Sequence, residues 1–358
     1  MTDETDRFYM EQVAPMLPGE ILDFHTHIWM ADQWLRIPGS ENISDSAGLG
    51  VSPAARYMST ELEYPAGSLE GDLLRSFPGK RCFAVCFGQP TPAVDTADTN
   101  KYVAESANED PRLFPLMVAG SGRIPPGAME DELDLRGFFG YKVFLDWIGN
   151  DYGNIRVEDM LSEAEMEIAD RRRLVVMLHV PRAGRLADPE IQAGVRNLAV
   201  SCPNAAIVLA HCGRCYHPLE MNRAIGPIAD LENVYMDTSM VMEPIILEKA
   251  IRSIGAGRLL FATDFPVAAM KGKRVNIRDH WVDVVASGYP ECQYRVPSDA
   301  FTPMCMAREI ALSVIIAAEA AGVGEGALEG IFYGNGMKLL KNACGGKSYK
   351  AKTGSPAH

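Results

Sequence analysis

The segment EILDFHTH, residues 20–27, joins a short apolar run to two histidines that stand two residues apart. The run over 20–24 predicts a buried strand. Because side chains alternate along a strand, His25 and His27 point to the same face. The strand therefore ends in two imidazoles that can coordinate one metal ion together.

Further short runs rich in Val, Ile, Leu and Phe follow at 81–87, 113–118, 138–145, 174–178, 206–210, 233–237 and 259–263. Runs that are apolar on both faces are typical of parallel strands covered by helices. Helical patterns lie between most of them, as in 156–173 and after Asp188, which offers an N-cap followed by Pro189. Eight strands with helical crossovers predict an α/β fold, a single-domain (β/α)8 TIM barrel.

The predicted barrel occupies residues 20–344. An appended helix is expected at 1–19 and a frayed tail at 345–358, where terminal residues are rarely tied down. No repeat and no linker divides the chain into two domains.

Two connections are too long to be simple turns: 28–67 after the first strand and about 266–303 after the eighth. Both leave the carboxyl ends of strands, the face where barrel enzymes place their active sites. We therefore expect them to be lids over a pocket. Helices around 304–321 and 326–341 are expected to close the barrel.

Composition excludes several classes of protein. The 358 residues are 47% hydrophobic, which suits a large buried core and not a disordered or coiled-coil chain. The net charge of −13 does not favour binding to nucleic acid, which is itself negatively charged. No apolar run is long enough to span a membrane. The acidic start lacks the pattern of a signal peptide, and eight cysteines are too sparse for a disulfide scaffold. We expect a cytoplasmic homo-oligomer that acts on a small molecule and binds neither nucleic acid nor a membrane.

Four of the apolar runs end in potential metal ligands. They are His25 and His27 after the first run, His179 after the fifth, His211 after the sixth and Asp264 after the eighth. Each histidine alone could be an ordinary hydrogen-bonded interior residue. Together at the mouth of an apolar barrel they would be costly to desolvate unless a divalent cation compensates. Three histidines and an aspartate with an open position match a catalytic Zn²⁺ or a similar ion.

Seven motifs support a family resemblance. They are DFHTH (23–27), GYKVFLDW (140–147), LVVMLHV (174–180), NAAIVLAHCGR (204–214), NVYMDTS (233–239), RLLFATDFP (258–266) and IFYGNGMKLL (331–340). From about residue 20 to 342 the sequence resembles the amidohydrolase superfamily, in particular its amidohydrolase-2 branch of hydrolases, lactonases and non-oxidative decarboxylases.

The resemblance implies roles that spacing alone does not give. His25, His27, His179 and Asp264 would hold one divalent metal ion, usually Zn²⁺, with Mn²⁺ or Fe²⁺ as alternatives. His211 would be the catalytic acid/base beside it.

Lys142 has two interpretations. In binuclear amidohydrolases a lysine at the end of the fourth strand becomes carboxylated and bridges two metals. The milder alternative is an interior lysine that pairs with Asp146 or binds a substrate carboxylate. We expect a mononuclear site, without a second metal.

Arginines and tryptophans after the strands are candidate substrate contacts. Arg214, Arg182 and Arg185 can present guanidinium forks to a carboxylate, although loop arginines are often simply solvated. Trp29 and Trp147 either line the pocket or pack under the lids.

Two further features bear on the site. Asp237, at the end of the seventh run, is expected to orient a ligand imidazole from behind. Cys212 and Cys215 form CGRC, but this motif follows a barrel strand and does not open a thioredoxin-like unit, so a local structural role is expected.

These residues support two reactions. In the first, an ester, lactone or amide bond of a small, carboxylated molecule is hydrolysed by metal-activated water, and His211 or Asp264 moves the proton. In the second, the same site removes CO₂ from an aromatic or unsaturated acid, with Arg214 on the carboxylate. A third hypothesis is a catalytically silent barrel with a binding or redox role.

Overall fold

The computed structural model describes residues 4–35, 62–144, 153–278, 280–286, 294–295 and 303–343. Within them the barrel wall consists of parallel strands. These are β1 (Glu20–His27), β2 (Arg81–Phe87), β3 (Leu113–Pro115), β4 (Met117–Val118), β5 (Gly140–Val143), β6 (Val175–Leu178), β7 (Ala206–Leu209), β8 (Val234–Asp237) and β9 (Leu259–Leu260).

The strands pair in sequence order, β1 to β3 in one sheet and β4 to β9 in another. The predicted run 113–118 contains both β3 and β4, and they are separated by Leu116, whose amide donates to Cys86 O at 2.9 Å. Backbone hydrogen bonds also join the last strand region to the first, from Phe24 N to Phe261 O and from Asp264 N to His25 O, each 2.9 Å. The wall is therefore continuous, and the predicted (β/α)8 barrel is confirmed.

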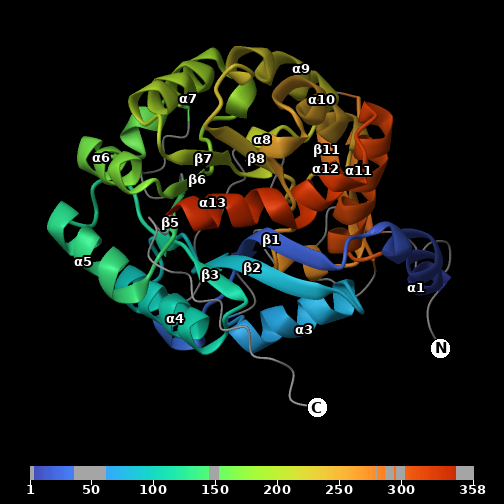
Figure 1. The fold of residues 1–358 in the computed structure, drawn as a ribbon, viewed down its shortest axis with the longest axis horizontal. Coiled ribbons are helices and arrows are strands. Elements are labelled where there is room, and N and C mark those ends of the chain that lie inside the picture. Colours follow the sequence, from blue (N-terminus) through green and yellow to red (C-terminus); the bar gives the residue numbers. More distant parts are fainter. Residues whose placement is uncertain are drawn as a thin grey trace.

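Helices surround this wall, with α3 to α7, α10 and α11 on its outside (Figure 1). The helices are α1 (Glu4–Phe8), α3 (Ala66–Ser76), α4 (Thr96–Glu109), α5 (Pro126–Arg136), α6 (Glu163–Arg172), α7 (Pro189–Ser201), α8 (His211–Arg214), α9 (Pro218–Ala224), α10 (Pro244–Ile254), α11 (Met306–Ala321), α12 (Glu325–Glu329) and α13 (Asn335–Ala343). None of the described helices is long and apolar enough to span a bilayer.

Two helix starts show how local chemistry sets the boundaries. Helix α7 begins as expected, because the Asp188 side chain accepts from Glu190 N at 2.9 Å. The expected helix over 156–173 is wrong at its start. Ser162 and Glu165 form a reciprocal capping box, so α6 begins only at Glu163 and a 3-10 turn precedes it.

The barrel interior is closed at one end by α13. Inward side chains such as Phe24, Met177 and Val208 share one cluster with Met337 and Leu340 of α13. The opposite end, where the strands finish, is left for polar side chains.

A register shift in β1 explains how two apolar residues and two histidines share the interior. Strict alternation would put Leu22 and Phe24 on the face opposite to His25 and His27. The pairing of β1 with β2 shifts between Asp23 and Thr26. Such an irregularity re-aims the side chains that follow it. Phe24 can therefore lie in the apolar interior while the histidines meet at the carboxyl end.

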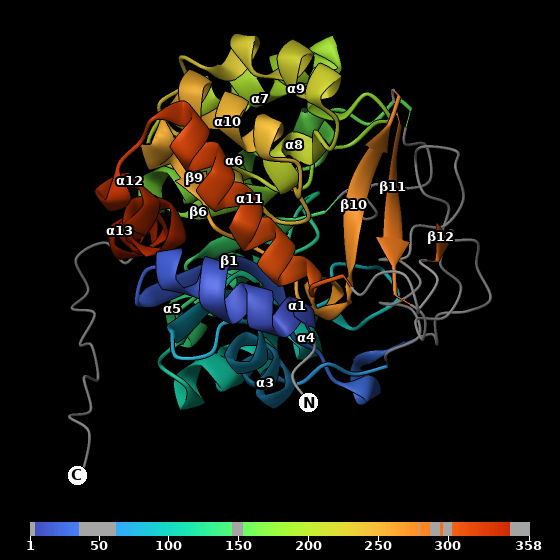
Figure 2. The ribbon, with the colours of Figure 1, turned by 90° about the vertical axis from the view of Figure 1, so that its right-hand side faces the viewer.

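The segment predicted as the second lid contains an antiparallel hairpin of β10 (Gly272–Ile277) and β11 (His280–Val285), and β12 (Tyr294–Arg295) pairs with β11. The hairpin stands to one side of the barrel (Figure 2). Most of the first lid and the whole tail 345–358 lie outside the described residues.

Candidate metal centre

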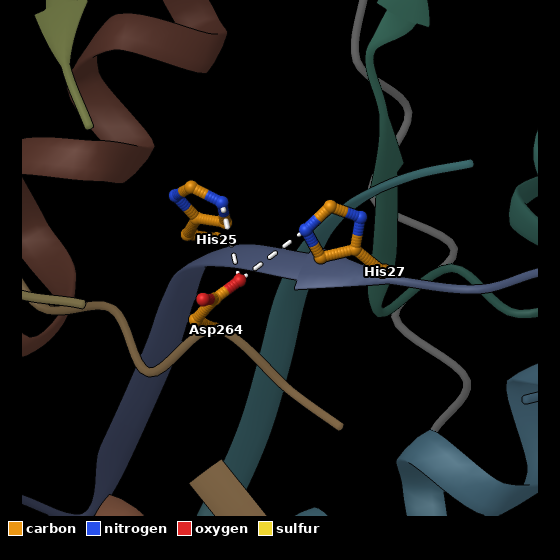
Figure 3. A group of neighbouring side chains, drawn as sticks. All are labelled: His25, His27 and Asp264. Atoms are coloured by element: carbon orange, nitrogen blue, oxygen red, sulfur yellow. Dashed lines mark ion pairs between the residues drawn. The ribbon is translucent and has the colours of Figure 1, made fainter. Parts of the chain in front are cut away.

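Residues from four separate parts of the chain meet at the carboxyl ends of the strands. Asp264 Oδ1 lies 3.5 Å from His25 Nε2 and 3.3 Å from His27 Nε2 (Figure 3). The His211 ring centre lies 4.9 Å from that of His25 and 5.2 Å from that of His179. The structure thus brings all five side chains together.

The protons of the two β1 histidines can be assigned from their partners. His25 Nδ1 lies 2.8 Å from Asp237 Oδ2, and His27 Nδ1 lies 3.2 Å from Gly88 O. A carbonyl and a carboxylate only accept, so both rings carry their proton on Nδ1. Both Nε2 lone pairs then face the oxygen of Asp264.

The pKa values of His27 and Asp264 keep these two side chains in the form that binds a cation. Burial lowers the pKa of His27 to about 4, despite the opposing pull of Asp264. Burial alone would raise the pKa of Asp264, but its contacts with His27, His25 and His211 outweigh burial and hold the pKa well below its usual value. The Nε2 atoms of His25 and His27 and Oδ1 of Asp264 therefore converge as possible ligands of one cation.

His179 provides an independent test of this fit. Its Nδ1 is buried and has no hydrogen-bond partner within the described part of the chain. Burial also holds its pKa well below the usual value, so the ring is neutral. A buried polar atom without a partner costs about 1–3 kcal/mol. A neutral imidazole with an unpartnered nitrogen, on a ring that packs against His211, fits a fourth ligand for a divalent metal ion.

Lys142 lies inside the barrel on β5 and is fully buried. Its Nζ donates to His25 Nε2 at 3.1 Å and stands 4.8 Å from the centre of the Phe87 ring. Burial lowers the pKa of this amine to about 8. Asp146, its other proposed partner, lies outside the described residues. The mononuclear interpretation of Lys142 stays a prediction.

Asp237 connects two of the histidines. Its Oδ2 accepts from His25 Nδ1, and its Oδ1 accepts from the backbone amide of His211, both at 2.8 Å. Burial opposes its ionisation, but the adjacent His25 lowers its pKa to about 2. The carboxylate thus supports the imidazoles from behind.

The three candidate arginines have different surroundings. Arg214 is buried, its Nη1 donates to Val180 O at 3.1 Å, and its charge contributes to the lowered pKa of His179. Arg182 donates from Nε to Ile155 O at 2.8 Å. Arg185 pairs with Glu220 at 2.9 Å. Of these three arginines, Arg214 is the one whose charge lowers the pKa of a proposed metal ligand, His179.

Trp29 is fully buried, and its indole N–H donates to Leu62 O at 3.1 Å. Its ring packs against Tyr64, with centres 5.7 Å apart. Trp147 lies outside the described residues. Cys212 and Cys215 are free and buried, and burial raises the pKa of both thiols. Such thiols are poor nucleophiles.

Sequence reasoning missed a cluster beside His211 that the hairpin supplies. Arg274 on β10 forms a two-pronged ion pair with Asp283 on β11, at 2.8 and 2.9 Å. The Arg274 guanidinium also stacks on Tyr216 and Trp281, 4.2 and 4.0 Å from their ring centres. Tyr216 follows α8, so this cluster fastens the hairpin to the barrel next to the metal centre.

Sequence reasoning also missed Ser239. It follows β8 by two residues, and its Oγ lies 2.8 Å from His211 Nδ1. Its place two residues after Asp237 in MDTS was the available signal.

A β/α barrel with buried histidines and an ionised aspartate at its strand ends has the features of a metal-dependent barrel enzyme. The amidohydrolase family model matches residues 22–276, and the chain belongs to this family. A search of curated proteins gave no significant match.

Solved structures agree on the fold. A zinc-bound amidohydrolase from Burkholderia multivorans is 15% identical, with a TM-score of 0.56. The 5-carboxyvanillate decarboxylase from Sphingomonas paucimobilis is 13% identical, with a TM-score of 0.57. In both cases the match covers 90% of this chain and 99% of the other. A putative 2-pyrone-4,6-dicarboxylic acid hydrolase from Pseudomonas putida is 15% identical, with a TM-score of 0.52 and coverage of 91% and 99%.

Proposed function

We propose that the chain hydrolyses an ester, lactone or amide bond in a small, carboxylated molecule, with one divalent ion held by His25, His27, His179 and Asp264. The convergence of the His25 and His27 Nε2 atoms on Asp264 Oδ1 carries this proposal. Zn²⁺ suits a site of three nitrogen ligands and one oxygen ligand, and Mn²⁺ and Fe²⁺ are the alternatives.

The bound ion supplies Lewis-acid chemistry to the carbonyl oxygen of the substrate. Asp264 is the most exposed of the groups joined in Figure 3, with 15% of its side chain accessible, and its lowered pKa keeps it ionised. It accepts the proton of the attacking water.

His211 delivers a proton to the leaving group. Burial lowers its pKa to about 3, so the resting ring is neutral. It takes over the water proton from Asp264 and then gives that proton to the leaving group. Each such proton transfer contributes roughly 10²- to 10⁴-fold in rate. Arg214 contacts the substrate carboxylate, while Arg182 and Trp29 shape the surrounding loops.

A second candidate reaction is the removal of CO₂ from an aromatic or unsaturated acid. Two observations favour it: the buried Arg214 acts electrostatically on His179, and a decarboxylase shares the fold. In this reaction His211 first takes up a proton from solvent. The bond from the substrate carbon to the carboxylate breaks, CO₂ leaves, and His211 gives that proton to the carbon. The same side chains serve both reactions.

Substrate panels distinguish the two. The zinc-loaded protein is incubated with lactones and with hydroxybenzoates, and acid release and CO₂ are measured. Acid release supports hydrolysis and CO₂ supports decarboxylation. Asp264→Asn is the control, because an enzyme of either kind should lose its activity with this change. A protein that binds no zinc, manganese or iron would instead support the silent barrel.

Elemental analysis of the purified protein tests the number of ions. One ion per chain is expected. Two ions per chain, lost together in Lys142→Ala, would instead support a carboxylated lysine that bridges two metals.

We also propose that the protein is a cytoplasmic homo-oligomer that acts on small molecules and does not bind nucleic acid or membranes. The acidic net charge supports the expectation that nucleic acid is not bound, and the sparse cysteines support the expected location. Light scattering of the purified chain tests the oligomeric state, and fractionation of cells that express the full chain tests the location.

A further inference from the structure

Ser239 lies between Asp237 and His211 and contacts both. It is fully buried just after β8. Its Oγ is 2.8 Å from His211 Nδ1 and makes a short hydrogen bond to Asp237 Oδ1. Its carbonyl oxygen is 3.2 Å from the same His211 Nδ1. One residue thus offers two oxygens to one ring nitrogen.

The direction of these hydrogen bonds follows from the donors around Asp237. His25 Nδ1, His211 N and Ser239 N all point at this carboxylate, at 2.8, 2.8 and 3.1 Å. A carboxylate surrounded by donors accepts, so the single hydroxyl proton of Ser239 goes to Asp237. The Ser239 oxygen is then left to accept from His211.

The carbonyl oxygen of Ser239 independently indicates that His211 carries its proton on Nδ1. A backbone carbonyl has no proton to donate, so the contact at 3.2 Å is a hydrogen bond only if His211 carries its proton on Nδ1. With Nδ1 protonated and committed to Ser239, Nε2 is the nitrogen left with a free lone pair.

We propose that Ser239 is a positioning residue that fixes His211 in the Nδ1–H tautomer, so that Nε2 is the nitrogen that exchanges a proton with the substrate. The consequence for catalysis rests on the proposed acid/base role of His211. The tautomer itself does not depend on that role and can be measured without a substrate.

The decisive measurement is the tautomer of His211 in the zinc-loaded protein. Long-range ¹H–¹⁵N correlation spectra of protein labelled at histidine separate protonated from unprotonated ring nitrogens. The His211 signals are assigned by their loss in His211→Asn. We expect Nδ1 of His211 to carry the proton in the unchanged protein. A proton on Nε2 would overturn the proposal.

Ser239→Ala removes the hydroxyl but keeps the carbonyl, so it weakens the preference for one tautomer without abolishing it. Losing one hydrogen bond of this kind corresponds to a fall of roughly tenfold. On the substrate found above, we expect kcat to fall about tenfold with KM changed less than about twofold, and the spectrum to show a mixture of tautomers. Ser239→Thr keeps a hydroxyl and should restore both readouts.

Ser313→Ala is the matched control. Ser313 is also buried, and its Oγ donates to a backbone carbonyl, Met242 O, at 2.8 Å. Ser313→Ala should lose about as much stability as Ser239→Ala, but it should keep the Nδ1–H tautomer of His211 and an unchanged kcat. If Ser239→Ala keeps the Nδ1–H tautomer unmixed and matches Ser313→Ala in kcat, Ser239 has only a structural role. If no substrate is turned over but the tautomer mixes in Ser239→Ala, the positioning role stands and only the proposed function fails.

Discussion

Replacing Asp237 with Asn tests whether the carboxylate behind the histidines sets the affinity for metal. Asp237 accepts from His25 on Oδ2, and from the amides of His211 and Ser239 and the Ser239 hydroxyl on Oδ1. Asparagine has nearly the same shape but only one oxygen, and its other terminal group is a donor. It therefore cannot accept on both sides.

The size of the loss in metal affinity follows from which side of the Asp237 carboxylate loses its acceptor. Three donors on the Oδ1 side favour the amide oxygen there, which turns the NH₂ group toward His25 Nδ1. Two donors would then face each other at about 2.8 Å, and His25 escapes this by moving its proton to Nε2. That is the nitrogen that faces Asp264. Loss of such a supporting partner typically lowers metal affinity 10- to 100-fold. We expect the upper end, about 100-fold, or about 2.8 kcal/mol.

Zinc affinity can be measured by competition with a chromogenic chelator. Asp170→Asn is the matched control, because this carboxylate accepts from Asn204 N at 2.7 Å and Asn204 Nδ2 at 3.1 Å and has no histidine partner among its described hydrogen bonds. A dissociation constant of Asp237→Asn within about threefold of the unchanged protein would refute the reasoning. An equal loss in Asp170→Asn would show that the effect is not specific to the site.

Four other outcomes are expected. His211→Asn should keep its zinc and lose about 10²- to 10⁴-fold in kcat, and survival of full turnover would contradict an acid/base role. Asp283→Ala leaves a buried guanidinium unpaired, which costs about 3–5 kcal/mol, and hydrogen exchange should speed up selectively in β10 and β11. Cys212 and Cys215 should resist thiol reagents until the protein is unfolded, and rapid labelling would revive the redox hypothesis. In zinc-loaded protein the His179 proton should be on Nε2, and nitrogen-resolved spectra showing it on Nδ1 would rule out metal binding through that atom.

The barrel wall could be predicted because buried parallel strands are continuous apolar runs. The run 81–87 coincides with β2, since nothing inside it interrupts the pattern. Boundaries that depend on side-chain hydrogen bonds were harder. The apolar face that begins near 156 gives no sign that Ser162 and Glu165 will close a capping box and start α6 later. Periodicity records which face is buried, and capping decides where the helix begins.

Residues at the ends of predicted strands could be predicted as a group, because all parallel strands of a barrel finish at the same rim. The hairpin of β10 and β11 could not be predicted in this way. Arg274, Asp283 and Trp281 lie in a segment with no long apolar run. The contacts of Arg274 and Trp281 with Tyr216 join residues about 60 positions apart. Only tertiary packing brings them together, so no local pattern announces them.

The sequence also does not say which nitrogen of each histidine faces the ion. His25, His27 and His211 each have an oxygen beside Nδ1, from Asp237, Gly88 and Ser239, which leaves the lone pair of each ring on Nε2. His179 is the exception, because its Nδ1 is the buried atom without a partner in the described residues. Identical side chains at equivalent strand ends thus have different hydrogen-bond partners, and the difference comes from oxygens far away in the chain. The motif selects the residue type, but the surrounding hydrogen bonds select the atom, and metal binding depends on the atom.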